Sequence, residues 1–298
     1  MHKQTAVNPL ATVSEPELVR LSRIADRLLA GRPSFTAGRR RDRNRAGGGT
    51  EFLDFRPYSS GDDLRHIDWR ITARSGRPYI RRYHDELSAD WYICLDRSTS
   101  MGFPDNEKWT LAVQLAAAVA YLLLHLGNRV GLIRFSSGID GVCSLGRGYG
   151  QYINIASQLR DSEPREGNCD SVLSSCARVL RQHWHVIVIS DFLKPDAMHT
   201  DLRYLRSTGR EVQAMQILSA HETTLGDNGM QTLRDAESGR QSALSLPAAG
   251  DLAHSRLQQL VTDLEEFSRR YRIHFTSCDT RLQWKEALVR HLRGIRHG

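Results

Sequence analysis

The chain has 298 residues, of which 40% are hydrophobic and 25% are charged. This length can hold one large or two modest domains, and the composition is ordinary for a soluble globular protein, which excludes wholesale disorder. The formal net charge of +7 is concentrated near the beginning, because residues 1–45 carry ten Lys or Arg residues against four Asp or Glu.

Residues 1–46 are predicted to form a basic helix followed by an arm. Apolar residues recur at helical spacing over 15–29, and five arginines follow within 39–45. Such a cluster could bind nucleic acid or an acidic membrane. No aromatic residues are interleaved with it, so we interpret it as a solvated basic arm.

Residues 47–90 have a different character and are treated as a separate subdomain. They are rich in arginine, aspartate and aromatic residues, with turn signals at 60–62 and 75–77 and a predicted strand at 78–83.

From residue 91 to 298, predicted strands alternate with predicted helices. The alternation predicts an α/β fold with a doubly wound, mostly parallel sheet and helices on both faces. A polar segment near 226–246 is predicted to be a hairpin insertion. The predicted strands are 91–95, 129–135, 139–145, 185–190, 211–218 and 272–276, and the predicted helices are 108–126, 149–159, 171–182, 196–207, 252–271 and 284–292.

The five cysteines are scattered and form no C-x-x-C pair, which favours reduced thiols in the cytoplasm over a zinc site. No signal peptide opens the chain. The most apolar segment, 111–126, is interrupted by polar residues and is shorter than the roughly 18 apolar residues of a spanning helix. We therefore predict a cytoplasmic protein with a buried core helix and no membrane span.

Carboxylates and hydroxyls gather at two predicted strand ends. Asp96 ends the run 91–95, Ser98 and Ser100 follow it, and Asp191 directly follows the run 185–190. The ends of parallel strands meet at one edge of a sheet, where ligands usually bind. These oxygens suit a hard cation such as Mg²⁺, with Mn²⁺ as the alternative. A polar turn without metal is the simpler interpretation of the first loop.

The pattern Asp96-x-Ser98-x-Ser100 resembles the metal-ion-dependent adhesion site (MIDAS) of von Willebrand factor A domains. The resemblance implies that Asp191 is the later aspartate of that site. The threonine of the family site has no clean match, since Cys169 or Ser171 aligns with it depending on register. Ser171 could donate a hydroxyl, whereas a thiol is a poor ligand for Mg²⁺.

A second resemblance covers the segment before this loop. It looks like the signature of the bacterial family called domain of unknown function 58, DUF58, in its shorter branch without membrane helices. The resemblance implies action with a MoxR-type AAA+ ATPase in the maturation or remodelling of other proteins, and it leaves the client protein open. The matching residues are Glu51-Phe52, Asp54 to Tyr58, Gly61 to Arg65, Ile67 to Arg70, Thr72 to Arg74 and Arg81 to Glu86.

The signature contains nearly equal numbers of acidic and basic side chains. Bidentate pairs between them could lock the subdomain onto the sheet, or the same charges could dock a partner or an anion. We favour the structural role. The side chains concerned are Asp62, Asp63 and Asp68 against Arg56, Arg65, Arg70 and Arg74.

We therefore predict a non-enzymatic interaction protein whose cation site presents an open position to a carboxylate of a partner. No phosphate-binding G-x-x-x-x-G-K-[ST] loop and no G-x-S-x-G elbow occurs. The alternatives are a metal-dependent hydrolase, a nucleic-acid-binding protein acting through the arm at 39–45, and a loop that has lost its metal.

Overall fold

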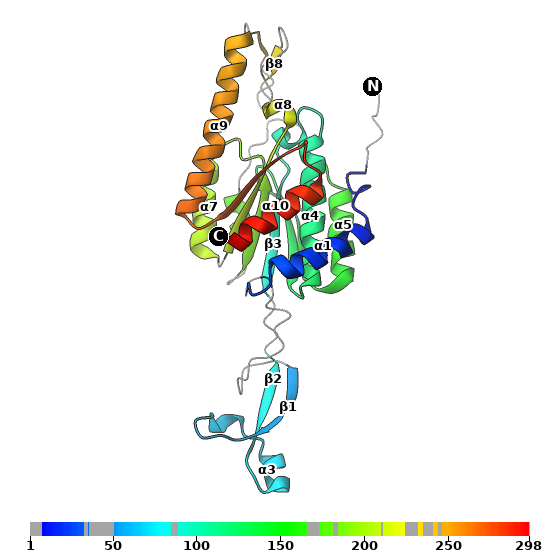
Figure 1. The fold of residues 1–298 in the computed structure, drawn as a ribbon, viewed down its shortest axis with the longest axis vertical. Coiled ribbons are helices and arrows are strands. Elements are labelled where there is room, and N and C mark those ends of the chain that lie inside the picture. The colour runs from blue at the N-terminus through cyan, green and yellow to red at the C-terminus, as the bar shows by residue number, and fades with distance from the viewer. Residues whose placement is uncertain are drawn as a thin grey trace.

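A computed structural model describes residues 8–32, 35, 51–84, 89–165, 173–180, 184–209, 211–223, 232–234, 241–243 and 246–297. Its body is a six-stranded sheet with the order β10-β7-β6-β3-β4-β5 (Figure 1). The basic arm at 39–45 lies outside the described residues.

The strand order confirms the predicted doubly wound, mostly parallel sheet. All neighbouring strands pair in parallel except β5, which returns antiparallel beside β4. From β3, the chain first builds outward through β4 and then resumes on the other side with β6. The strands are β3 (Asp90–Asp96), β4 (Arg129–Phe135), β5 (Ile139–Gly146), β6 (His185–Ser190), β7 (Glu211–Leu218) and β10 (His274–Asp279).

Helices cover both faces of this sheet, and β3 shows why. Its side chains alternate between two cores: Trp91, Ile93 and Leu95 join one, while Tyr92 and Cys94 join the other. The first core is covered by α1 (Glu15–Leu28), α4 (Glu107–His125), α5 (Gly148–Arg160) and α10 (Trp284–His297), and the second by α6 (Ser174–Ala177), α7 (Pro195–Thr208) and α9 (Leu246–Arg270).

The apolar segment predicted to be a core helix is α4. By length and composition α4 could cross a membrane, but 83% of its most apolar window is buried inside the protein. It packs between the sheet and helices α1, α5 and α10 (Figure 1). The helix therefore serves as the centre of the core.

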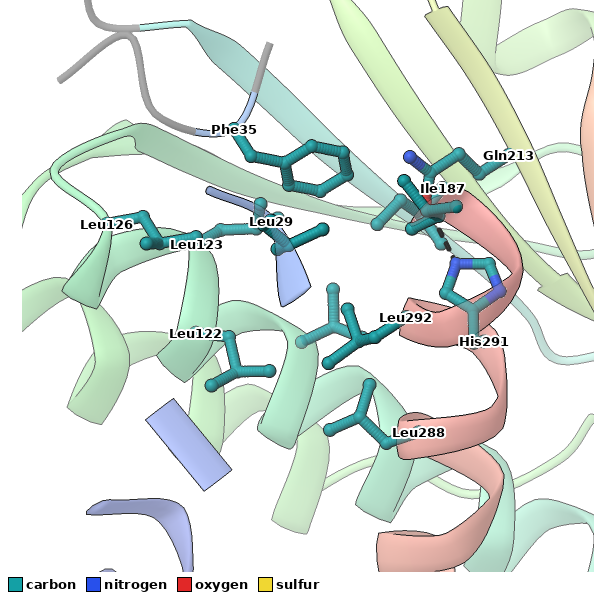
Figure 2. Close-up of a pocket in the computed structure, with 12 residues that line it drawn as sticks. Leu29, Phe35, Leu122, Leu123, Leu126, Ile187, Gln213, Leu288, His291 and Leu292 are labelled. Atoms are coloured by element: carbon teal, nitrogen blue, oxygen red, sulfur yellow. Dashed lines mark hydrogen bonds between the residues drawn. The ribbon is translucent and has the colours of Figure 1, made fainter. Parts of the chain in front are cut away.

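A small cavity of about 10 Å³ lies between α1, α4, α10 and the sheet. Figure 2 shows that leucine side chains line most of it and that His291 reaches Gln213 at one end. His291 Nε2 and Gln213 Oε1 are 2.9 Å apart, and His291 Nδ1 lies 3.0 Å from Thr276 Oγ1. The polar groups satisfy each other, so this cavity is a packing defect beside a hydrogen-bond network.

Two predicted elements differ from the structure. The described part of the predicted helix 171–182 contains only the four-residue α6. The last strand begins at His274 instead of residue 272, because Arg272 adopts a positive φ of 54° and ends α9. Ile273 N then donates back to Ser268 O at 2.8 Å, which is the pattern of a helix C-terminal cap.

The polar segment after β7 contains a short antiparallel pair. Strand β8 (Thr232–Arg234) pairs with β9 (Gln241–Ala243) within the predicted hairpin insertion. Residues 235–240, which connect the two strands, lie outside the described residues.

The signature subdomain is a second antiparallel pair, formed by β1 (Glu51–Pro57) and β2 (Tyr79–His84), with η2 (Leu64–His66) and α3 (Trp69–Ser75) between them. Asp68 organises it: Oδ1 accepts from Arg70 N at 2.8 Å, and Oδ2 accepts from Arg81 Nε at 2.6 Å.

The ion pairs described for three aspartates of this subdomain join them to other residues of the same subdomain. Asp62 pairs with Arg56, Asp63 with Arg65, and Asp68 with Arg81. The expectation that the charges of the signature pair with one another is confirmed for Asp62 and Asp63. These pairs do not reach the sheet, so the expectation that they lock the subdomain onto it is wrong for the three aspartates. They instead fix the turn and the start of α3.

Candidate cation site at the carboxyl edge of the sheet

The candidate site lies where β3 and β6 end. These strands are parallel neighbours, with Leu95 opposite Ile189. Asp96 is therefore level with Ser190, and Asp191 follows one residue later, near enough for its charge to act on Asp96. The chain continues from β3 and β6 in opposite directions along the sheet, which makes this edge a topological switch point. The predicted convergence of the two aspartates is therefore found in the structure.

Hydrogen bonds fix the first loop of the site. Asp96 Oδ1 accepts from Ser98 N at 2.8 Å, and Asp96 Oδ2 accepts from Ser190 Oγ at 2.6 Å. The hydroxyls of Ser98 and Ser100 lie 3.1 Å apart at the start of η3 (Thr99–Gly102). The three oxygen-bearing side chains predicted from the sequence thus come together on one tight turn.

All three of these side chains are buried, and Asp96 is completely so. Burial raises the pKa of Asp96 to about 6, and the nearby charge of Asp191 adds to the effect, while hydrogen bonds from Ser190 and Ser98 oppose it. A desolvated carboxylate beside a second carboxylate is a favourable position for a cation.

The second loop turns sharply after β6. Phe192 has a positive φ of 52°, and its N–H donates to Ser190 Oγ at 3.1 Å. Gln216 Nε2 donates to the carbonyl oxygen of Asp191 at 3.1 Å. Gln216 Oε1 is buried without a hydrogen-bond partner in the described part of the chain. This edge of the sheet therefore holds an unused acceptor as well as the carboxylates.

Lys108 is the main site residue that the sequence analysis missed. It lies in the first turn of α4 with 1% of its surface exposed. Its Nζ is 3.1 Å from Asp191 Oδ2 and 2.6 Å from Glu222 Oε1. Burial acts to lower the pKa of Lys108, but Asp191 and Glu222 outweigh burial and raise it. The residue is therefore charged at neutral pH.

One sequence signal could have revealed Lys108. It stands three and four residues before Leu111 and Ala112, on the buried side of a helix whose other inward positions are apolar. A lysine at such a position needs a buried partner. Glu222, in the short α8 (Ala220–Thr223), carries no comparable signal, since it is 114 residues away and follows a strand end.

The donor set fits a divalent cation by charge and by atom type. The ammonium of Lys108 contacts Asp191 and Glu222, while Asp96 is bonded by the neutral donors Ser98 N and Ser190 Oγ. Three carboxylates and one ammonium therefore leave two negative charges uncompensated among these four groups. The oxygens of Asp96, Ser98 and Ser100 are hard ligands of the kind that Mg²⁺ prefers. Ser171, the remaining predicted ligand, lies outside the described residues.

The residues described contain no cluster of three His, Cys, Asp or Glu side chains arranged around a metal position. The site above depends on two serine hydroxyls, which are not of those residue types. The described cysteines are free thiols buried in the protein. Burial raises the pKa of the Cys278 thiol to about 11, so this residue is not a nucleophile at neutral pH.

A groove of about 590 Å³ runs beside the first turn of α4. Glu107 lies in its wall and accepts a hydrogen bond of 2.8 Å from Thr280 Oγ1. Lys285 and Glu17, which also line the groove, form an ion pair, and the buried Trp284 lines it as well. The groove therefore carries charges of both signs, and one of its lining residues, Glu107, directly precedes Lys108 in the sequence.

A model of the family described as "Protein of unknown function DUF58" matches residues 54–258, which is most of the chain. A relative, "Uncharacterized protein Rv1480" of Mycobacterium tuberculosis (strain ATCC 25618 / H37Rv), is 29% identical over 260 residues, covering 85% of this chain and 81% of the relative.

Two solved structures are similar to this chain with TM-scores below 0.5. The conserved hypothetical protein BatB from Bacteroides thetaiotaomicron has a TM-score of 0.41 and 14% identity, covering 71% of this chain and 100% of that one. The vWF domain of the type V pili tip protein Mfa5 from Porphyromonas gingivalis has a TM-score of 0.38 and 12% identity, covering 70% and 94%. The strand order β10-β7-β6-β3-β4-β5 by itself defines the doubly wound α/β fold of this chain.

Proposed function

We propose that this chain, which belongs to the family described as Protein of unknown function DUF58, is a protein-interaction module that binds its partner through a divalent cation. The cation is Mg²⁺, with Mn²⁺ as the alternative. Asp96, Ser98 and Ser100 hold it, Ser171 is the further predicted ligand, and Asp191 lies beside it. When bound, the cation supplies a positive charge that attracts a carboxylate of the partner.

The observation that carries this proposal is the convergence of Asp96, Ser98 and Ser100 on one buried turn beside Asp191. The turn is held by Ser98 N and Ser190 Oγ, so its oxygens are positioned before any cation arrives. A buried site strengthens the attraction between the cation and an incoming carboxylate, because water screens it less.

Burial also sets a requirement for partner binding. Ser98 and Ser100 expose less than a tenth of their surfaces. A partner carboxylate can reach the cation only if the residues covering them move. The adjoining groove beside Glu107 offers the partner a first contact surface.

The resemblance to the DUF58 signature makes a MoxR-type AAA+ ATPase the leading partner, in the cytoplasm. The resemblance does not identify the client protein. No described feature favours nucleic acid as the partner.

A metal-dependent hydrolase is less well supported, because such an enzyme needs a proton acceptor or a second metal beside the ion. The structure places Lys108 against Asp191, and the neighbouring carboxylates keep this ammonium protonated. A protonated ammonium cannot accept a proton from water, and the carboxylates of Asp191 and Glu222, which could act as bases, are already bonded to it.

The test measures capture of the purified MoxR-type ATPase of the same organism by the immobilised chain, in Mg²⁺ and in chelator. We expect Asp96→Asn to abolish the Mg²⁺-dependent part of the binding. Asp90→Asn is the matched control, because Asp90 begins the same strand and pairs with Arg129 away from the site. Equal capture by wild type in Mg²⁺ and in chelator overturns the cation bridge.

A further inference from the structure

The carboxyl edge of the sheet already contains a positive charge. Lys108 is among the largest side chains with less than 2% of their surface exposed. Its ammonium contacts Asp191 from the loop after β6 and Glu222 from α8. It thereby joins three segments that meet at the candidate cation site.

The ammonium and a divalent cation compete for Asp191. Lys108 Nζ lies 3.1 Å from Asp191 Oδ2. A cation bound to that oxygen would stand within a few ångströms of the ammonium, and the two like charges would repel in a poorly screened environment. Asp96 has no such conflict, because its described hydrogen bonds come from Ser98 N and Ser190 Oγ, which are neutral.

Glu222 strengthens the hold of Lys108 on this position. Its Oε1 accepts from Lys108 at 2.6 Å, and its Oε2 accepts from Ser219 N at 2.7 Å. Both carboxylate oxygens are therefore used, and the ammonium is held between two acids. A lysine so placed does not leave its position without breaking both contacts.

We propose that Lys108 is a built-in cation that occupies Asp191 and Glu222, confines a divalent ion to Asp96, Ser98 and Ser100, and weakens the binding of that ion. This inference rests on the proposed function, because it concerns the same site. On this proposal, Mg²⁺ can leave the site even though three carboxylates lie at this edge of the sheet.

The experiment measures Mn²⁺ binding by the full chain, using electron paramagnetic resonance of free Mn²⁺ and isothermal titration calorimetry, with Mg²⁺ as competitor. We expect Lys108→Met to tighten Mn²⁺ binding at least tenfold, since it removes a positive charge and releases Asp191. Adding Asp191→Asn to Lys108→Met should return most of that gain. Lys285→Met is the matched control, because it removes one lysine from an ion pair outside the site.

A second variant keeps the test decisive if Lys108→Met does not fold. Lys108→Met with Glu222→Gln removes one charge of each sign, and circular dichroism verifies its fold. It should still bind Mn²⁺ more tightly than wild type, because Asp191 is free.

The outcomes separate the two proposals. Unchanged or weaker Mn²⁺ binding in the folded Lys108 variants overturns the role of Lys108 while leaving the cation site intact. No binding by wild type together with binding by Lys108→Met supports the built-in cation and overturns the cation bridge. No binding by either overturns both.

Discussion

Ser190 Oγ donates a hydrogen bond of 2.6 Å to Asp96 Oδ2, so the last residue of β6 holds the carboxylate that ends β3. The same hydroxyl accepts from Phe192 N at 3.1 Å. Asp96 is therefore oriented across the switch point by neutral donors. Lys108, the nearby ammonium, contacts Asp191 instead. Because the hydrogen-bond donors of Asp96 are neutral and Lys108 is paired with Asp191, burial has the largest effect on the pKa of Asp96.

The first prediction concerns Asp96→Asn in the absence of divalent cations. Burial raises the pKa of Asp96 to about 6, above the unfolded value of about 3.9. Its contribution to stability is therefore complete below about pH 4 and is lost as pH rises through 6. At pH 7.5 we expect Asp96→Asn to be more stable than wild type by about 3 kcal/mol, and at pH 4 the difference should nearly vanish.

Urea unfolding in chelator between pH 4 and 8 measures this difference. Asp90→Asn is the control, since Asp90 pairs with Arg129 at the opposite end of β3. If Asp96→Asn is less stable than wild type at pH 7.5, then ionisation of the Asp96 carboxyl does not lower the stability of the wild type as predicted.

The second prediction concerns stabilisation by Mg²⁺. A ligand that binds only the folded state stabilises it by about 2.7 kcal/mol at one hundred times its dissociation constant. Wild type should therefore melt several degrees higher in excess Mg²⁺ than in chelator. Ser98→Ala removes one oxygen ligand and should reduce this shift, and Asp96→Asn should abolish it. Equal shifts in all three proteins, measured by differential scanning calorimetry, would mean that Mg²⁺ binds elsewhere.

The third prediction decides which residue supplies the remaining ligand. The sequence leaves Cys169 and Ser171 open, and both lie outside the described residues. A hydroxyl is a better ligand for Mg²⁺ than a thiol. We therefore expect Ser171→Ala to weaken Mg²⁺ binding by about tenfold, as removal of one oxygen ligand would, and Cys169→Ala to leave it unchanged. Calorimetric titration of the two variants measures this, and the reverse order would show the other register.

The parts of the site found from the sequence are those encoded locally. Asp96 and Asp191 each follow an apolar strand, and parallel strands bring their ends to one edge. Lys108 and Glu222 were missed because their partners are distant along the chain: Lys108 lies 83 residues from Asp191 and 114 from Glu222. Periodicity reports which residues face the core, but it does not report which buried charges meet there.

The fold shows the same distinction. The strand at 185–190 is predicted correctly because a continuous run of β-branched residues is typical of a central strand buried on both faces, and all six residues are buried in the structure. The short α6 was overestimated because the apolar residues at 173, 176, 177 and 180 keep helical spacing beyond its end. After Ala177 the backbone continues in tighter turns, in which Val179 N donates to Cys176 O at 3.0 Å.

The fourth prediction concerns acid stability and His291. Burial lowers the pKa of His291 well below its usual range, and nearby His274 adds to this effect. The unfolded chain then binds more protons than the folded one, so stability falls as pH drops below about 6.5. His291→Gln should cost stability at pH 8, because the links to Gln213 and Thr276 change. It should also flatten the decline between pH 6.5 and 5.

This measurement is made in the Asp96→Asn background. Asp96 titrates in the same range with the opposite sign, so its removal leaves the histidines as the main contributors. Urea unfolding at half-unit pH intervals gives the slope, expected near 1.4 kcal/mol per pH unit for one proton. An equal slope with and without His291 would assign the acid sensitivity to His274, whose pKa burial also lowers.

The last prediction separates docking from structure in the signature subdomain. Trp69 exposes 70% of its surface at the start of α3. Arg70 and Arg74 follow it without a carboxylate partner in the part of the chain that the structure covers. Exposed tryptophan and arginine are the residues that most often dominate protein interfaces. We therefore expect Trp69→Ala to weaken capture of the MoxR-type ATPase at least tenfold while changing stability by less than about 0.5 kcal/mol.

Tyr149→Ala is the matched control, because Tyr149 exposes 55% of its surface on α5, in the body of the protein. Capture and urea unfolding are measured for both variants. A loss of more than about 1 kcal/mol in Trp69→Ala would mean that the tryptophan packs against the protein itself, because a solvent-exposed side chain loses little on truncation. Retained capture at unchanged stability would remove this face from the partner interface and leave the arginines as solvated charges.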